Sequence, residues 1–203
     1  NTSGVVYVAV DGAYAGAILI ADTVKPEAKA AVAALKAGGV RKTVMLSGDR
    51  RAIAEKVGRE IGLDEVHAEL MPDEKYKELE ALMAEDSSTV MYVGDGINDA
   101  PSIARADVGV AMGAIGQDSA IEAADVVIMS DSLDKLPTAV KVARKTLRIS
   151  KENIVFALAV KAAVMILGCL GLASMWMAVF ADVGVAVLDI LNAMRTLRIK
   201  DAG

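Results

Sequence analysis

Three oxygen-bearing side chains follow a short apolar run near the middle of the chain. Residues 90–93 predict a buried strand, and Asp95, Asn98 and Asp99 come within the next six residues. Clustered oxygen ligands at the carboxyl end of a buried strand favour a site for Mg²⁺ and phosphate in an α/β fold. Gly96 would let the backbone turn sharply beside such a ligand. The alternative is an ordinary Asp-Gly turn that binds nothing.

Two other segments carry groups that suit a phosphoryl group. Ser47, Gly48 and Asp49 follow the apolar residues 43–46, and Lys75 begins a charged helical pattern. A hydroxyl, an ammonium and metal-binding carboxylates stabilise a transferring phosphoryl group mainly by positioning it and neutralising its charge. Each segment also has a structural alternative. The serine loop could cap a helix, and the lysine could be one solvated charge among many.

The elements around these residues alternate between strands and helices. The predicted strands cover residues 43–46, 66–70, 90–93, 108–111 and 126–129. Between them lie predicted helices over residues 26–38, 50–61, 100–105 and 117–123 and a charged helix that follows residues 71–75 and ends near residue 85. This order predicts an α/β fold with a Rossmann-like parallel sheet covered on both faces. The strand ends, and with them the polar residues, should meet at one edge. Before this unit, Asp11-Gly12 between two apolar runs predicts a β-hairpin.

Composition excludes several classes of protein. The net charge is −5 without a basic stripe, so we expect no nucleic-acid partner. A single cysteine and a single histidine exclude a disulfide framework and the usual zinc-finger spacing. No signal peptide is visible. The chain starts at Asn1 with residues that already resemble a strand, so we expect it to be a fragment.

Two apolar runs dominate the last quarter of the chain. Residues 154–173 and 175–194 are each long enough to cross a hydrocarbon core of about 30 Å. Basic residues precede the first run and follow the second, whereas the connection near Ser174 is uncharged. This distribution predicts a transmembrane hairpin with both ends cytoplasmic, and Trp176 at the outer interface. The alternative is a pair of buried helices in a soluble core.

Three charged residues lie inside these runs: Lys161, Asp182 and Asp189. Charges within membrane spans are functional candidates by default. Counted from the cytoplasmic ends, Lys161 and Asp189 lie at similar depths and Asp182 lies deeper. One interpretation is a structural salt-bridge set, in which depth favours Asp189 as the partner of Lys161. The other makes Asp182 an oxygen ligand in a cation path, with Lys161 as its counter-ion. The sequence leaves open which aspartate the lysine contacts.

The strand-end motifs together resemble those of P-type cation-transporting ATPases, whose phosphorylation domain belongs to the haloacid-dehalogenase superfamily. Residues 93–101, VGDGINDAP, match the hinge motif of that family. Residues 46–50, LSGDR, resemble its TGD loop with Ser47 in place of threonine, and residues 71–75, MPDEK, resemble its P-x-D-K motif. The resemblance covers nearly the whole chain.

This resemblance implies roles for particular residues. Lys75 would face the phosphate, Asp95 would bind Mg²⁺ with support from Asn98 and Asp99, and ATP would be the phosphoryl donor. Asp22 and Lys25 sit where the family's chain returns from the nucleotide-binding domain. The implied divisions are the end of the nucleotide-binding domain at 1–21, the phosphorylation domain at 22–144, a linker helix at 145–153, the membrane pair at 154–194 and a cytoplasmic tail at 195–203.

The family's nucleophile is missing from this sequence. Members form an aspartyl-phosphate on a DKTGT loop, and no DKTG occurs here. An acyl-phosphate route needs such a carboxylate. We therefore expect the fragment to be inactive by itself and to need an N-terminal part of the same polypeptide. The alternative functions are a truncated, non-enzymatic membrane module that binds metal or a partner and, less favoured, a membrane-tethered phosphatase.

The last apolar segment resembles a subgroup of this family. Residues 181–195, ADVGVAVLDILNAMR, are similar to the final helix of zinc/cadmium/lead-exporting ATPases. In that group the aspartate of a D-x-G motif is a transport-site ligand and a lysine in the preceding helix is its partner, which implies these roles for Asp182 and Lys161. The resemblance implies a multi-pass protein of the plasma membrane that contacts lipid and exports a divalent metal. The group's Cys-Pro-Cys helix is not in this sequence, and Cys169 does not replace it.

Overall fold

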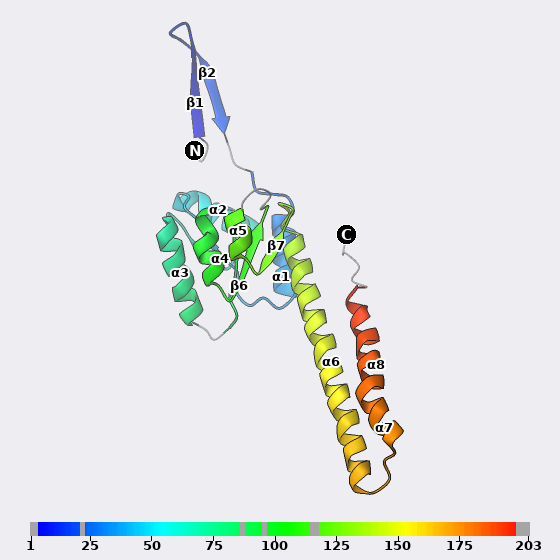
Figure 1. Cartoon of the computed structure of the whole chain (residues 1–203). Coiled ribbons are helices and arrows are strands. Elements are labelled where there is room, and N and C mark those ends of the chain that lie inside the picture. Colours follow the sequence, from blue (N-terminus) through cyan, green and yellow to red (C-terminus); the bar gives the residue numbers. More distant parts are fainter. Residues whose placement is uncertain (1–3, 21–22, 86–87, 95–96, 114–117, 198–203) are drawn as a thin grey trace. The chain divides into compact units, whose positions relative to one another are not determined.

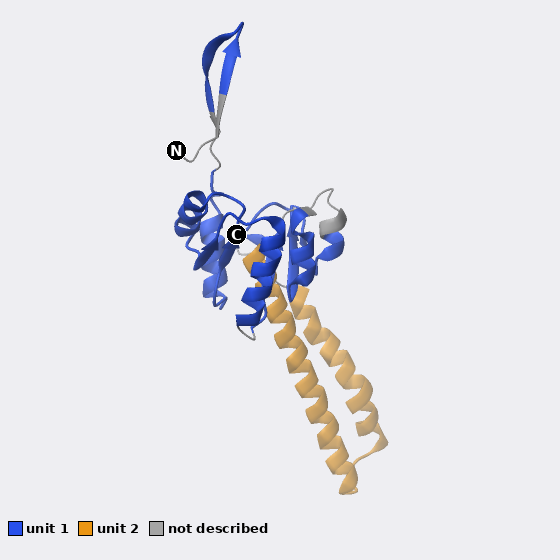
Figure 2. Ribbon diagram, turned by 90° about the vertical axis from the view of Figure 1, so that its left-hand side faces the viewer, with its two compact units in different colours: residues 1–135 blue, residues 136–203 orange. Residues whose placement is uncertain are grey.

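The computed structural model describes residues 4–20, 23–85, 88–94, 97–113 and 118–197. The chain divides into two compact units, residues 1–135 and 136–203. Figure 2 shows these units in blue and orange. The division falls earlier than the expected end of the phosphorylation domain at residue 144.

The first unit begins with the predicted hairpin. Strands β1 (Gly4–Val10) and β2 (Ala13–Ile20) pair antiparallel, with an irregularity between Val8 and Ala9. Asp11 and Gly12 join them with φ values of 52° and 79°. Two consecutive positive φ angles are typical of the turn whose twist matches that of the flanking strands. The Asp-Gly signal is therefore confirmed.

Five parallel strands follow, but they form two sheets and not one. Strand β3 (Val44–Leu46) pairs with β4 (Glu65–His67), and β5 (Met91–Gly94), β6 (Val108–Met112) and β7 (Val126–Ile128) form the second sheet. The parallel α/β fold that the sequence predicted is confirmed, and among the described residues its strands are divided between two sheets. The predicted strand at residues 66–70 also ends early, because Glu69 turns the chain with a φ of 65°.

The helices lie between these strands as the alternation predicted. They are α1 (Ala28–Ala37), α2 (Arg51–Ile61), α3 (Pro72–Glu85), α4 (Ala100–Arg105) and α5 (Asp118–Ala123) (Figure 1). In β6, the consecutive residues Val110, Ala111 and Met112 are all buried. Successive side chains of a strand point to opposite faces, so this strand is covered on both sides. Ile103 of α4 packs on one of these faces with Ala111.

The carboxylate of Asp64 fastens the loop before β3 to the loop before β4. Its Oδ1 accepts a hydrogen bond from Nζ of Lys36 at 2.6 Å, and its Oδ2 accepts from N and Oγ1 of Thr43 at 2.8 and 2.7 Å. The Lys36 ammonium and the two Thr43 donors lower the pKa of Asp64 to about 2. This carboxylate therefore links the end of α1 to the start of β3.

The second unit is a helical hairpin. Helix α6 (Lys135–Cys169) runs without a break through the expected boundaries at residues 144 and 153. The returning segment consists of α7 (Met175–Val179), a π-helical turn at Phe180–Gly184, α8 (Val185–Ala193) and a short 3₁₀ turn at Met194–Leu197. The stretches 135–169 and 175–197 each contain an apolar window with mean hydropathy 1.8, enough by length and composition to cross a membrane.

The apolar side chains of this hairpin are mostly exposed. Leu158 and Met165 of α6 are 63% and 67% exposed, and Ile190 of α8 is 64% exposed. A pair of helices in a soluble core would bury such residues. The covered positions of the hairpin include Leu136 and Ile149 of α6, Ala181 of the π-helical turn and Val185 of α8. The exposure favours the membrane interpretation.

The hydrogen bonds to the Asp64 carboxylate predict that the stability of the fold depends on pH. A carboxyl whose pKa is lowered on folding stabilises the fold above its unfolded pKa near 3.8, and this contribution is lost as the pH falls through about 2. Asp64→Asn should therefore lower the urea midpoint of the detergent-solubilised chain at pH 7, and its difference from the wild type should shrink between pH 4 and about pH 2. Far-UV circular dichroism would follow the unfolding.

The matched control is Asp73→Asn, because in the part of the chain that the structure describes Asp73 pairs only with Lys77, at 3.7 Å on the surface of α3. Exposed pairs of this kind contribute little. If the difference in urea midpoint between the wild type and Asp64→Asn stayed constant from pH 7 to pH 2, this would contradict the stabilising role of the ionised Asp64 carboxylate.

Candidate functional site

The segment after β5 places an aspartate back against the strand. Strand β5 ends at Gly94, and a single 3₁₀ turn at Ile97–Asp99 returns the chain. A Cβ atom on residue 94 would lie 2.7 Å from Cβ of Asp99 and 3.2 Å from Cδ1 of Ile103. Real Cβ atoms essentially never approach so closely. Glycine at this position is therefore required for Asp99 to pack here.

Asp99 is the centre of a half-buried polar cluster. Its side chain is 12% exposed and that of Lys75 is 22% exposed. The Oδ1 atom of Asp99 accepts hydrogen bonds from Nζ of Lys75 at 3.2 Å and from the hydroxyl of Tyr92 at 3.0 Å. Removing an ion pair from water is costly unless further hydrogen bonds support it. Tyr92 provides this support, and the cluster fixes the lysine ammonium beside the end of β5.

Sequence reasoning missed Tyr92, although a signal was present. Side chains at positions i and i+2 of a strand lie on the same face, so Tyr92 shares its face with Gly94. Because the glycine leaves room there for Asp99, a polar group two residues earlier can reach the carboxylate. A tyrosine inside an otherwise apolar strand was the clue.

Ser47, Gly48 and Asp49 form a compact turn. The Ser47 hydroxyl donates to Oδ2 of Asp49 at 2.9 Å and accepts from the backbone N–H of Asp49 at 3.1 Å. A Cβ atom on Gly48 would approach the carbonyl oxygen of Leu70 to 3.2 Å. The residue before α2 is Arg50, whose side chain does not cap the helix, and the backbone N–H of Arg51 donates to Oε1 of Glu69 at 3.4 Å. The alternative of a helix cap is therefore wrong.

This turn is joined to the segment that leads into α3. The backbone N–H of Leu70 donates to the carbonyl of Ser47 at 3.0 Å, and that of Glu69 donates to the carbonyl of Asp49 at 2.9 Å. Two residues later α3 begins and carries Lys75. Within the described part of the chain, no hydrogen bond or ion pair links Ser47 directly to Lys75 or Asp99. Backbone hydrogen bonds thus join the serine turn to the segment that leads into the helix of Lys75.

The remaining expected site residues are placed only in part. Asn98 is exposed in the 3₁₀ turn. Lys25 binds the loop after β7, where its Nζ donates to the backbone oxygen of Asp131 at 2.8 Å and pairs with its carboxylate. Asp22, Asp95 and Gly96 lie outside the described residues, so the roles expected of them stay predictions.

In the helical hairpin, Lys161 contacts Asp182. Its Nζ lies 3.2 Å from Oδ1 of Asp182, which settles the choice that the sequence left open. Asp182 lies within the π-helical turn, where the N–H of Val185 donates to the carbonyl of Phe180, five residues earlier. A Cβ atom on Gly184 would lie 2.5 Å from the Phe180 ring. The glycine of the D-x-G motif therefore permits this turn, and such turns are frequent at functional sites.

Comparison with known proteins finds relatives along the whole chain. Residues 2–107 match the family model described as haloacid dehalogenase-like hydrolase. A cadmium, zinc and cobalt-transporting ATPase of Bacillus subtilis is 52% identical over 99% of this chain, and a zinc-transporting ATPase of Synechocystis is 56% identical over 94%. The chain spans 29% and 27% of the length of these two relatives.

A solved structure has the same fold over nearly all of the chain. The crystal structure of a zinc-transporting PIB-type ATPase in an E2.Pi state superposes with a TM-score of 0.85. The sequences are 38% identical, and the match covers 97% of this chain and 32% of the other. The α/β unit and the helical hairpin are therefore both represented in that structure.

The Tyr92–Asp99 hydrogen bond predicts a loss of stability in Tyr92→Phe. The substitution removes one of the two donors to a buried carboxylate, so the free energy of unfolding should fall by about 1–2 kcal/mol. Urea unfolding of the detergent-solubilised chain would measure it, with amide exchange in β5 as a local probe.

Tyr7→Phe is the matched control, because Tyr7 is 73% exposed in the hairpin. It should leave the stability unchanged. Equal unfolding midpoints for the two variants would show that the tyrosine hydroxyl does not support the Lys75–Asp99 pair.

Proposed function

The chain belongs to the haloacid dehalogenase-like hydrolase family, and on that premise we propose that it is part of an ATP-driven heavy-metal exporter of the P-type. The first unit would hold one half of a phosphoryl-transfer site, and the helical hairpin would span the membrane and carry a cation ligand. The Lys75–Asp99–Tyr92 cluster is the observation that carries this proposal, because it fixes an ammonium at a strand end where a phosphoryl group would be bound.

The proposed chemistry at this strand end is positioning and charge neutralisation. Lys75 would bind the phosphoryl oxygens, and the hydroxyl and N–H groups of the Ser47 turn would contact the same group from the neighbouring sheet. Asp99 holds the lysine through Oδ1, which leaves its Oδ2 to support a metal ion. Asp95 would be the principal Mg²⁺ ligand, and Mg²⁺ would neutralise the charge of the phosphoryl group.

The divided sheet supports the proposal that the nucleophile comes from elsewhere in a longer polypeptide. Among the described strands, β3 pairs only with β4 and β5 pairs only with β6, so each has one unpaired edge. Both edges belong to parallel sheets whose carboxyl ends carry site residues. A strand inserted between them would complete the hydrogen bonds and bring a nucleophilic aspartate next to Ser47, Lys75 and Asp95.

The hairpin would supply the path of the transported ion. Asp182 offers a carboxylate ligand for a divalent cation of the zinc, cadmium or lead type, and Lys161 at 3.2 Å is a built-in counter-ion. When a metal ion binds Asp182 the lysine must give way, and when the ion leaves the lysine can return. This exchange keeps the carboxylate neutralised in both states. Membrane lipid would cover the exposed apolar side chains, with both ends of the hairpin in the cytoplasm of a plasma-membrane protein.

The first test concerns the missing half of the site. Incubated with [γ-³²P]ATP and Mg²⁺, the chain of 203 residues should form no acid-stable phosphoprotein, because its sequence lacks the DKTG nucleophile. A longer polypeptide that adds the nucleophile loop and nucleotide-binding domain should be labelled. Labelling of the shorter chain would contradict the division of the site.

The second test uses substitutions in that longer polypeptide. Lys75→Ala should reduce phosphoenzyme formation by about 100-fold or more while metal binding persists, because a charge facing the phosphoryl group is lost. Asp182→Ala should abolish metal-stimulated ATP hydrolysis. Lys77→Ala is the control, since Lys77 lies on the same helix and its side chain is 74% exposed. Normal turnover in Lys75→Ala or Asp182→Ala would overturn the assigned role.

A further inference from the structure

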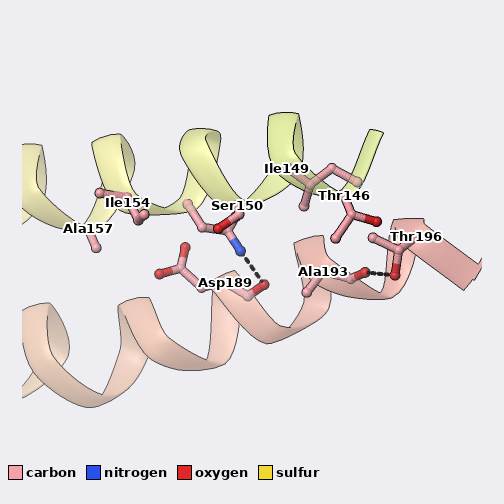
Figure 3. A pocket seen from close by; sticks show the side chains of 9 residues that line it. Thr146, Ile149, Ser150, Ile154, Ala157, Asp189, Ala193 and Thr196 are labelled. Carbon is pink, nitrogen blue, oxygen red and sulfur yellow. Dashed lines mark hydrogen bonds between the residues drawn. The ribbon is translucent and has the colours of Figure 1, made fainter. Parts of the chain in front are cut away.

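Two asparagines join the helices of the hairpin at its open end, away from the connection. The side-chain N–H of Asn153 in α6 donates to the backbone oxygen of Asp189 at 2.9 Å. The side-chain N–H of Asn192 in α8 donates to the side-chain oxygen of Asn153 at 2.6 Å. The dashed line at Asp189 in Figure 3 marks the first of these bonds. Both bonds bridge the two helices, and we call Asn153 and Asn192 the amide pair.

The amide pair belongs to a larger polar network. Arg195 donates to the side-chain oxygen of Asn192 at 2.8 Å and also lies 3.5 Å from Oε2 of Glu152, which neighbours Asn153 on α6. Each asparagine therefore uses a side-chain donor and its side-chain acceptor within the network. A polar network whose members are satisfied rigidifies the structure around it and specifies one arrangement.

Apolar packing between the helices is loose at this end. An open pocket of about 310 Å³ is lined by both helices, and its walls include Ser150 and Ala157 of α6 and Ala193 of α8. The covered positions Ala181 and Val185 lie nearer the connection. Because lipid tails offer apolar side chains contacts as good as those with another helix, directional hydrogen bonds gain importance in holding such helices together.

The amide pair and the Lys161–Asp182 contact agree in register. Lys161 follows Asn153 by eight residues, and Asp182 precedes Asp189 by seven. These separations correspond to about 12 and 10.5 Å along the two helices. Antiparallel helices that are joined at the amide pair therefore bring Lys161 and Asp182 to nearly the same level. A slip by one helical turn, about 5.4 Å, would break the amide bonds and also separate the lysine from its carboxylate.

We propose that Asn153 and Asn192 are positioning residues that close the open end of the hairpin and thereby keep Lys161 opposite Asp182. A single polar asparagine in the core of a coiled coil specifies the register of its helices in a comparable way, at a cost in stability. The connection fixes the helices at the other end of the hairpin. Lys161 and Asp182 therefore lie between two fixed points.

This inference rests on the proposed function, in which Lys161 gives way when a metal ion binds Asp182 and returns when the ion leaves. Between fixed helices, this exchange needs only a movement of the lysine side chain. If the open end separated, the ammonium would spend less time near the carboxylate and would compete less well with the ion. The amide pair would therefore promote release of the ion without contacting it.

Distances between spin labels, measured by electron paramagnetic resonance on the chain in lipid nanodiscs, test the amide pair. Cys169→Ala removes the native thiol. Labels on Leu158→Cys and Ile190→Cys report on the open end, and labels on Ile166→Cys and Trp176→Cys report on the connection. These four positions are 63%, 64%, 59% and 76% exposed, so the labels fit without disturbing buried contacts.

Replacing both asparagines by leucine, Asn153→Leu with Asn192→Leu, removes the hydrogen bonds and keeps side chains of similar size. The distances at the open end should then spread over about one helical turn, 5.4 Å, or more, whereas those at the connection should stay narrow. Lys151→Leu is the matched control, because Lys151 is exposed on α6 and should leave both distributions unchanged. Circular dichroism checks that each variant is helical. An unchanged distribution at the open end of the double variant would overturn the inference.

The link to ion release is tested in the longer polypeptide that carries the nucleophile. The double leucine variant should form as much phosphoenzyme with Zn²⁺ and ATP as the wild type. Its Zn²⁺-stimulated turnover per phosphoenzyme should fall about threefold or more, the effect of losing an interhelical hydrogen bond. Unchanged turnover, or phosphoenzyme lost in proportion to turnover, would overturn the positioning role. Normal turnover in Asp182→Ala would instead contradict the proposed function, and the spin-label distances would still decide whether the amide pair closes the hairpin.

Discussion

A charge that leaves water needs an opposite charge or hydrogen-bond donors close by, and the largely buried Lys75–Asp99 pair meets this requirement. The Lys161–Asp182 pair, whose side chains are 56% and 75% exposed in the hairpin alone, would meet it inside a membrane. Lys75 and Asp99 are 3.2 Å apart at the end of β5, and Lys161 and Asp182 are 3.2 Å apart in the hairpin. Each pair joins elements that are distant in sequence, α3 to the 3₁₀ turn after β5 and α6 to the π-helical turn. Among the described residues each lysine is held by one aspartate. In the proposed function the Lys75 ammonium would also bind an anion, and Lys161 would release its aspartate to a cation.

The sequence predicted the elements of the α/β unit well because their signals are local. Asp11-Gly12 identifies a hairpin turn, and apolar runs bounded by glycine identify the strands. The division into two sheets could not be predicted in this way, because strand pairing depends on every strand that is present. Likewise, local signals do not predict the close packing of Asp99 against Gly94 or the hydrogen bond from Tyr92 to Asp99, because both depend on how the chain folds back. Only the two-residue spacing of Tyr92 and Gly94 along β5 indicated them.

The partner of Lys161 shows why depth alone was insufficient. Counting from the outer ends of the two apolar runs placed Lys161 level with Asp189, yet the lysine contacts Asp182. In a helical hairpin the register is set at the connection. From the end of α6 at Cys169 to Lys161 there are eight residues, and from the start of α7 at Met175 to Asp182 there are seven. The two residues are therefore level when counted from the turn. The sequence predicted a linker helix at 145–153 before the apolar run that starts at residue 154, whereas α6 is one helix from Lys135 to Cys169.

The two aspartates of the returning helix differ in what neutralises them. Asp182 has a permanent cation in Lys161 and sits in a π-helical turn, where an extra residue per turn changes the direction of the side chain. Asp189 lies in regular α-helix, and the amides of Asn153 and Asn192 bind its backbone and each other but not its carboxylate. A fixed ammonium competes with any metal ion for Asp182, so a metal must displace the lysine to bind there. No such competitor faces Asp189 among the described residues.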